Sequence, residues 1–188
     1  MESILLFDQN FLLFIQEHIR LEWLNPIVMF ITSLGNSGII WIILGLVLVC
    51  FKKTRRAGIL SLLCLIVAWL VNDFILKEIF ARTRPYEVIE GLTHLGKVEG
   101  SFSFPSGHTN ASFAAAFGLT AGFGKKGAWS YVLATLIAFS RCYVGVHYLT
   151  DILGGMIVGT VMAFVAYKLF ECIAPRIEES LKKRASNK

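Results

Sequence analysis

The sequence predicts an all-α protein, a polytopic bundle of helices embedded in a membrane. Of its 188 residues, 55% are hydrophobic and only 16% are charged, whereas about 25% of the residues in a soluble domain carry a charge. The apolar residues gather in runs close to the ~20 residues that a helix needs to cross a bilayer. Short basic clusters flank these runs, as they do in cytoplasmic loops. We therefore expect a single membrane-embedded domain over residues 1–176 and a polar cytoplasmic tail over 177–188.

The apolar runs divide the domain into successive elements. Residues 1–22 mix apolar and polar side chains, which predicts an amphipathic helix lying at the membrane interface. An apolar stretch then begins at Pro26 and is interrupted by polar residues at 32–38, so we interpret it as a hairpin of two short spans. Residues 80–107 form the one long polar loop. The expected spans cover about residues 24–34, 38–51, 57–79, 108–123, 127–146 and 150–172.

The basic clusters also predict an orientation. The net charge of +5 could indicate nucleic-acid binding, but the clusters at 52–56, 125–126 and 182–184 follow the pattern of a membrane protein. They are separated by even numbers of expected spans, so all three can face the cytoplasm. This places the 80–107 loop and the turn near His147 at the outer face of the plasma membrane. None of the cysteines stand at metal-ligand spacing, and no metal or cofactor site is predicted.

Two cations mark the outer end of the 57–79 span. Lys77 and Arg84 are seven residues apart, which is about two turns if the helix continues, so both would project from nearly one face. Pro85 favours an end to the helix at or before Arg84. Two cations directed at one point suit a phosphate group. Side chains that extend to lipid headgroups explain this pair equally well.

A second segment, Phe104–Thr109 with the sequence FPSGHT, follows the loop and opens a helix. The free N–H groups at a helix N-terminus form an anion site, and Gly107 allows a ligand to approach the backbone closely. Ser106 can add a hydroxyl donor, and His108 lies on the first turn. Taken alone, the segment is explained more simply by a helix cap at Ser106 and an interfacial histidine.

A third segment pairs a histidine with a carboxylate. His147 and Asp151 are spaced i,i+4 and would be neighbours on a helix. Such a carboxylate fixes the imidazole tautomer and stabilises the cation, and the histidine can then act as a nucleophile. Arg141 supplies a third cation. Because a charge at the head of a span is costly unless it is paired, we interpret Asp151 as functional.

Together the three segments resemble the type 2 phosphatidic acid phosphatase family, whose pattern is K-x6-RP, PSGH and SR-x5-H-x3-D. All eleven fixed positions match in order, within roughly residues 70–160. The resemblance implies an acid phosphatase and vanadium haloperoxidase-like helical core and a phosphatase that uses no metal or cofactor. It implies that His147 is the nucleophile, Asp151 its orienting carboxylate and His108 the general acid. The phosphate cradle would comprise Lys77, Arg84, Arg141, Ser106 and Gly107.

The resemblance further implies that the substrate is a lipid phosphate or diphosphate, held among membrane lipids. An outer-facing site favours undecaprenyl diphosphate. Phosphatidylglycerophosphate, phosphatidic acid and phosphoryl transfer from His147 to another lipid stay open as alternatives. Vanadium haloperoxidases share the motifs but are soluble and much larger, so the hydropathy argues against that class. A scaffold or channel would leave the intact set of motifs unexplained.

One carboxylate lies outside the family pattern. Asp73 sits within an apolar run, where a lone charge is expensive to bury. It precedes Lys77 by four residues, in the order that suits a helical ion pair. We interpret Asp73 as holding the Lys77 ammonium toward the phosphate, with a water-filled crevice or a contact with Asn72 as the alternative. Ser140 is a second candidate for such a supporting role.

Overall fold

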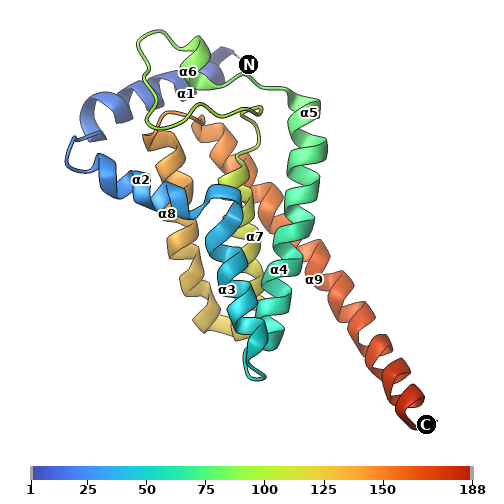
Figure 1. Cartoon of the computed structure of the whole chain (residues 1–188). Coiled ribbons are helices and arrows are strands. Elements are labelled where there is room, and N and C mark those ends of the chain that lie inside the picture. The colour runs from blue at the N-terminus through green and yellow to red at the C-terminus, as the bar shows by residue number, and fades with distance from the viewer. Residues whose placement is uncertain (1, 187–188) are drawn as a thin grey trace.

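A computed structural model shows how these segments are arranged. It describes the backbone of residues 2–186 and the side chains of residues 3–176. Within this part of the chain every regular element is helical, and the long helices pack side by side as a bundle (Figure 1). The predicted all-α fold is confirmed.

The helices follow the expected order along the chain. Several short π and 3-10 turns, labelled η, connect or extend them. The elements are α1 (Glu2–Phe14), η1 (Ile15–Ile19), α2 (Asn25–Leu34), η2 (Asn36–Gly38), α3 (Ile39–Cys50), α4 (Arg55–Val71), η3 (Asn72–Leu76), α5 (Lys77–Phe80), α6 (Pro85–Val88), α7 (Gly107–Phe123), η4 (Gly124–Trp129), α8 (Ser130–Tyr143) and α9 (Leu149–Ser186).

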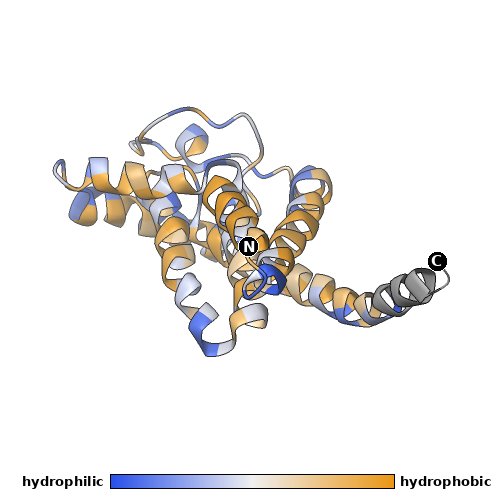
Figure 2. Ribbon diagram, turned by 60° about the horizontal axis from the view of Figure 1, so that its bottom comes forward, coloured by the Kyte–Doolittle hydropathy of each residue, from blue (hydrophilic) through white to orange (hydrophobic). Residues whose placement is uncertain are grey.

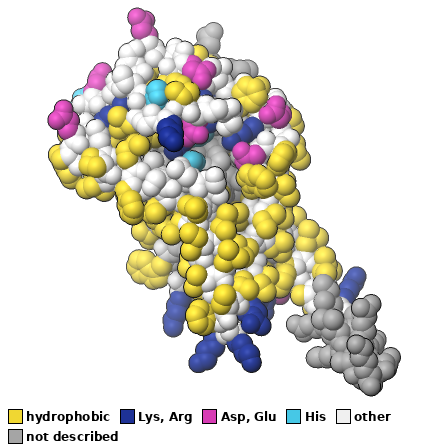
Figure 3. Space-filling model, in the orientation of Figure 1, with side chains coloured by type: hydrophobic (Ala, Val, Ile, Leu, Met, Phe, Trp, Pro, Cys, Tyr) yellow, Lys and Arg dark blue, Asp and Glu magenta, His cyan; other side chains and the backbone are white. Residues whose placement is uncertain are grey.

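The surface shows how the bundle meets a membrane. In the described residues, the segments Arg55–Val88 and Leu149–Arg176 are long and apolar enough to span a bilayer. The pair formed by α2 and the segment Asn36–Cys50 passes the same test jointly. Hydrophobic residues dominate these helices (Figure 2), and a wide apolar band separates a basic end from an end that carries the visible acidic side chains (Figure 3). This division is typical of a membrane protein.

The interrupted stretch is not the predicted hairpin. Its two helices meet at a bend of 49° instead of folding back on each other. Ser37 and Gly38 both adopt left-handed backbone conformations, with φ of 51° and 66°, so two successive residues leave the helical region. The backbone of the predicted polar tail continues α9 as far as Ser186. The side chains of residues 177–188 lie outside the described part of the chain.

α7 is the central helix and packs against α4, α8 and α9. Small residues allow the close approach of α4. A Cβ at Gly118 would lie 2.5 Å from Ser61 Cα, and one at Gly122 would overlap Ala57. Helices inside membranes commonly pack through such small residues. The position of α7 matters for function because its N-terminus carries the FPSGHT segment.

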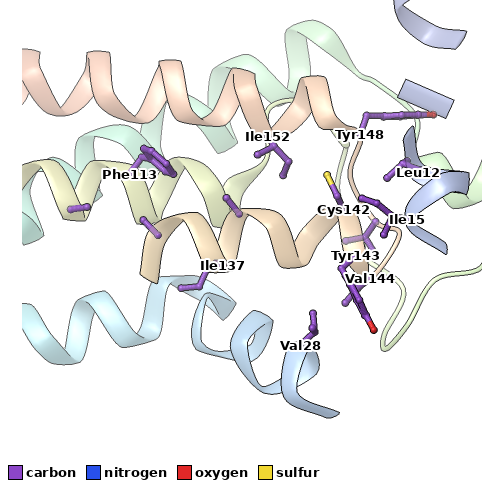
Figure 4. Packing of buried hydrophobic residues seen from close by; sticks show 14 of the residues in the cluster. Leu12, Ile15, Val28, Phe113, Ile137, Cys142, Tyr143, Val144, Tyr148 and Ile152 are labelled. Atoms are coloured by element: carbon purple, nitrogen blue, oxygen red, sulfur yellow. The ribbon is translucent and has the colours of Figure 1, made fainter. Parts of the chain in front are cut away.

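The N-terminal segment is part of the bundle. Leu12 and Ile15 are buried in the cluster that Figure 4 shows, together with Val28 of α2 and Tyr143 of α8. Five other large apolar side chains of α1 are at least half exposed (Ile4, Leu5, Leu6, Phe7 and Phe14). α1 therefore packs against the core while its outer apolar side chains stay free to contact lipid.

Candidate active site

The three motifs meet at the end of the bundle opposite the turn between α3 and α4, whose exposed lysines and arginines lie at the lower end in Figure 3. Most of the motif residues stand near a helix end or in a connecting segment, whereas Lys77 directly follows the π-helical turn η3 within the helix that continues from α4 into α5. Lys77 opens α5, Arg84 precedes α6, Ser106 to His108 open α7, Arg141 lies in the last turn of α8, His147 lies between α8 and α9, and Asp151 lies in the first turn of α9.

His147 is buried and contacted at both ring nitrogens. Its Nδ1 lies 3.2 Å from Asp151 Oδ2, and its Nε2 lies 3.3 Å from Arg84 Nη1. Asp151 Oδ2 also accepts hydrogen bonds from the Tyr148 N–H and the Ser103 hydroxyl. Because the carboxylate can only accept, it favours the tautomer with the proton on Nδ1. The lone pair of Nε2 then faces the cations.

Burial sets the charge of this ring. It lowers the pKa of His147 to about 4, although the hydrogen bond to Asp151 and the negative charge of Asp151 act in the opposite direction. The imidazole is therefore neutral at neutral pH. A neutral ring with an oriented lone pair is the form that can act as a nucleophile.

Lys77 and Arg84 converge, but not through the continuous helix that we considered. α5 ends at Phe80, and Ala81 takes a left-handed conformation with φ of 42°. Both cations instead donate to one hydroxyl, with Ser101 Oγ 3.2 Å from Lys77 Nζ and 3.3 Å from Arg84 Nη2. The 80–107 loop, which carries Ser101, thus brings the two side chains together.

Lys77 also makes the ion pair expected from the sequence. Its Nζ lies 2.8 Å from Asp73 Oδ1 across the π-helical turn η3. Asn72 Nδ2 donates to the other Asp73 oxygen at 3.3 Å. A Cβ added at Gly107 would lie 3.5 Å from Lys77 Nζ, so the ammonium sits beside the start of α7. An anion bound there would meet both the ammonium and helical N–H groups.

Arg141 is buried and held from two sides. Nη1 donates to Thr32 Oγ1 at 2.8 Å, and Nη2 pairs with Glu99 of the 80–107 loop. Burial raises the pKa of Glu99, but attraction to Arg141, followed by Arg84, outweighs it and leaves the pKa below its ordinary value. Glu99 lines two cavities of about 370 Å³ each, one beside Arg141 and the other beside Arg84. An ionised carboxylate therefore lies between the two arginines.

The FPSGHT segment supplies the remaining groups. Ser106 is buried, its backbone N–H donates to Asp151 O at 3.1 Å, and its hydroxyl oxygen accepts from Thr109. His108 Nε2 lies 3.0 Å from Asn36 Oδ1. A Cβ at Gly35 would be 2.6 Å from the His108 ring. The break between α2 and α3 therefore positions His108.

Some residues of the site have no clear sequence signal, and one candidate makes no side-chain bond to the others. The hydroxyl of Ser140 donates to Ile137 O at 2.6 Å within its own helix, so its bond is not made to the other site residues. Most of the residues that sequence reasoning missed contact a predicted residue directly, and Asp8 does so only through Arg82. The missed residues are Asp8, Thr32, Asn36, Arg82, Glu99, Ser101 and Ser103. Polar residues interrupting the apolar stretch at 32–38 were the available signal for Thr32 and Asn36.

A helical membrane bundle with a buried histidine–carboxylate pair beside clustered cations defines the class as a membrane phosphatase. The family model of the PAP2 superfamily matches residues 57–172, and the chain belongs to this superfamily. The predicted family and the hydrolase class are confirmed.

Individual relatives agree with this assignment. The chain is 29% identical to an undecaprenyl-diphosphatase of Sulfolobus acidocaldarius over 87% of this chain and 79% of that relative. It is 36% identical to phosphatidylglycerophosphatase B of Bacillus subtilis over 78% and 75%. The crystal structure of a transmembrane PAP2 type phosphatidylglycerolphosphate phosphatase from Bacillus subtilis superposes with a TM-score of 0.72, at 31% identity over 92% of this chain and 89% of that one.

The low pKa of His147 predicts the acid limb of the pH profile. Protonation removes the Nε2 lone pair, so kcat/KM should stay level in mildly acidic buffer and fall about tenfold per pH unit below about 4. The profile should be measured with two substrates whose phosphate pKa values differ, which separates enzyme titration from substrate titration. An enzyme limb centred near the ordinary histidine value of 6.5 would contradict a buried neutral ring.

Proposed function

We propose that the protein hydrolyses a lipid phosphate or diphosphate at the outer face of the plasma membrane, through a phosphohistidine at His147. The observation that carries the proposal is the buried imidazole, with Nδ1 3.2 Å from Asp151 and Nε2 3.3 Å from Arg84. This geometry directs a nucleophile at a position where a cation can hold the phosphate.

The first step forms the covalent intermediate. The Nε2 lone pair attacks phosphorus, and the bond from phosphorus to the leaving oxygen breaks. His108 donates a proton to that oxygen, while Asp151 stabilises the positive charge that the His147 ring acquires. In the second step water attacks the phosphohistidine, His108 takes a proton from the water, and phosphate leaves. His147 is returned to its neutral form.

The charge on the transferring group is neutralised by side chains. Lys77, Arg84 and Arg141 face the phosphoryl oxygens, and Ser106 and the Gly107 N–H add hydrogen bonds. These groups supply the electrostatic stabilisation that metal ions provide in many other phosphoryl-transfer sites, and we propose that no metal or cofactor takes part. A bound phosphate takes the place of the Glu99 carboxylate on Arg141. Asp73 keeps the Lys77 ammonium beside Gly107.

Undecaprenyl diphosphate is the proposed substrate. The undecaprenyl-diphosphatase of Sulfolobus acidocaldarius aligns with 87% of this chain, and an outer-facing site suits a carrier lipid of wall synthesis. Phosphatidylglycerophosphate is the second candidate, favoured by the 36% identity to phosphatidylglycerophosphatase B. Phosphatidic acid, and transfer of the phosphoryl group to another lipid, use the same chemistry.

The covalent step is tested by replacing the nucleophile. His147→Ala should abolish phosphate release because no other group replaces the Nε2 lone pair. Wild-type protein quenched during turnover should carry phosphate that is labile in acid and stable in base. His18→Ala removes an exposed histidine of the N-terminal segment and should leave turnover unchanged. Substantial hydrolysis by His147→Ala would exclude this mechanism.

A panel of lipids tests the substrate. Purified protein should release free phosphate from undecaprenyl diphosphate with a higher kcat/KM than from phosphatidylglycerophosphate or phosphatidic acid. A preference for phosphatidylglycerophosphate would reassign the substrate. Phosphate recovered on an added lipid acceptor, in place of free phosphate, would show a phosphotransferase.

Cysteine labelling tests the orientation. In a variant without its native cysteines, Val98→Cys places a thiol on the exposed part of the 80–107 loop, and Lys126→Cys places one at the basic end. An impermeant thiol reagent should label the first variant in intact cells and the second only after lysis. The reverse pattern would put the site on the cytoplasmic side.

A further inference from the structure

Two carboxylates that are distant in sequence share one guanidinium beside the candidate active site. Arg82 Nη2 lies 2.8 Å from Asp8 Oδ2, and Arg82 Nη1 lies 2.6 Å from Asp151 Oδ1. Both carboxylate side chains are 0% exposed. The guanidinium is also fixed from one face, with its carbon 3.8 Å from the centre of the Tyr148 ring. Arg82 is therefore held rigidly between α1 and α9.

Thr150 links the same two helices a second time. Its backbone N–H donates to Asp8 Oδ1 at 3.1 Å, and its hydroxyl donates to Asp8 Oδ2. Arg82 Nη1 donates to the Thr150 hydroxyl at 2.7 Å. The N–H groups at the start of a helix lack partners within the helix. Asp8 therefore holds the first turn of α9, which is the turn that carries Asp151.

The need to anchor α1 to the core does not by itself explain why the Asp8 carboxylate is buried. Leu12 and Ile15 already fasten the N-terminal segment to the core, and burying an ion pair is often no better for stability than apolar packing. The arrangement instead affects the charge near His147. Asp8 and Asp151 carry two negative charges against the one positive charge of Arg82. Because Asp8 shares the guanidinium, Asp151 is not fully neutralised and stays a strong acceptor for His147 Nδ1.

We infer that Asp8 is a positioning residue for the reaction, acting through Arg82 and Thr150 on Asp151 and so on His147. The inference rests on the proposed role of His147 as the nucleophile. Asp8 fixes the start of α9 and keeps a residual negative charge behind the imidazole. That charge is needed most when the ring becomes positive on taking the phosphoryl group. The effect belongs to the transition state and the intermediate, not to substrate binding.

The test is a split between kcat and KM. Asp8→Asn keeps the shape of the side chain but removes its charge, and kcat should fall by about 10–100-fold, the range seen for groups that orient metal-ligating histidines. KM should change by less than about threefold, because the phosphate cradle is untouched. Glu17→Gln neutralises an exposed carboxylate of the same N-terminal segment and should behave as wild type. Undiminished kcat in Asp8→Asn would overturn the inference.

Two further variants separate positioning from folding. Thr150→Val removes one hydroxyl but nearly keeps the side-chain shape, so the variant should still fold, with a Tm lowered by a few degrees because Asp8 loses one donor. Its kcat should fall several-fold, and an unchanged kcat would overturn the inference. The double variant Arg82→Gln, Asp8→Asn should lose much less kcat than the product of the two single-variant losses in kcat, because the residues act as a unit. Fully multiplicative losses in kcat would also overturn the inference.

Wild-type activity in Asp8→Asn together with an inactive His147→Ala would reject only this inference, whereas an active His147→Ala would reject the proposed mechanism.

Discussion

The structure depends on compensating buried charge at one end of an apolar bundle. Lys77, Arg84 and Arg141 are between 3% and 7% exposed, and a cation so deeply buried is stable only with partners. Asp73 and Glu99 pair with two of them, and backbone carbonyls and Ser101 accept from Arg84. Under the proposed function, the same arrangement prepares a binding place for an anion, with a phosphate replacing the Glu99 carboxylate on Arg141.

This requirement explains irregular features of the fold that apolar packing alone does not. The break between α2 and α3 interrupts an otherwise apolar stretch, yet it brings Thr32 to Arg141 and Asn36 to His108. The 80–107 loop crosses the site and contributes Ser101 and Ser103 to different charged groups. Irregular backbone inside a membrane protein is tolerated where it is buried in protein or lines a cavity. The polar groups of the site therefore come largely from helix ends and breaks.

The sequence predicted the fold class and the charged centre because both have short-range signals. The Asp73–Lys77 contact follows from helical spacing. The His147–Asp151 contact was predicted too, but His147 lies before the start of α9 and not on a helix. The predicted hairpin was wrong, and the helix does not continue to Arg84, since left-handed residues at Ser37 and Ala81 have no strong signature. The contacts of Asp8 could not be predicted, because Thr150 lies 142 residues away. Spacing within a helix carries no information about such pairs.

A structure with orthovanadate bound would test the central claim most directly, because vanadate adopts the five-coordinate geometry of a phosphoryl group in transfer. The account predicts vanadium bonded to His147 Nε2, with its oxygens contacting Lys77, Arg84, Arg141 and the Gly107 N–H, and with Glu99 displaced from Arg141. Vanadate bound away from His147, or the Glu99–Arg141 pair unbroken with vanadate in the site, would contradict it.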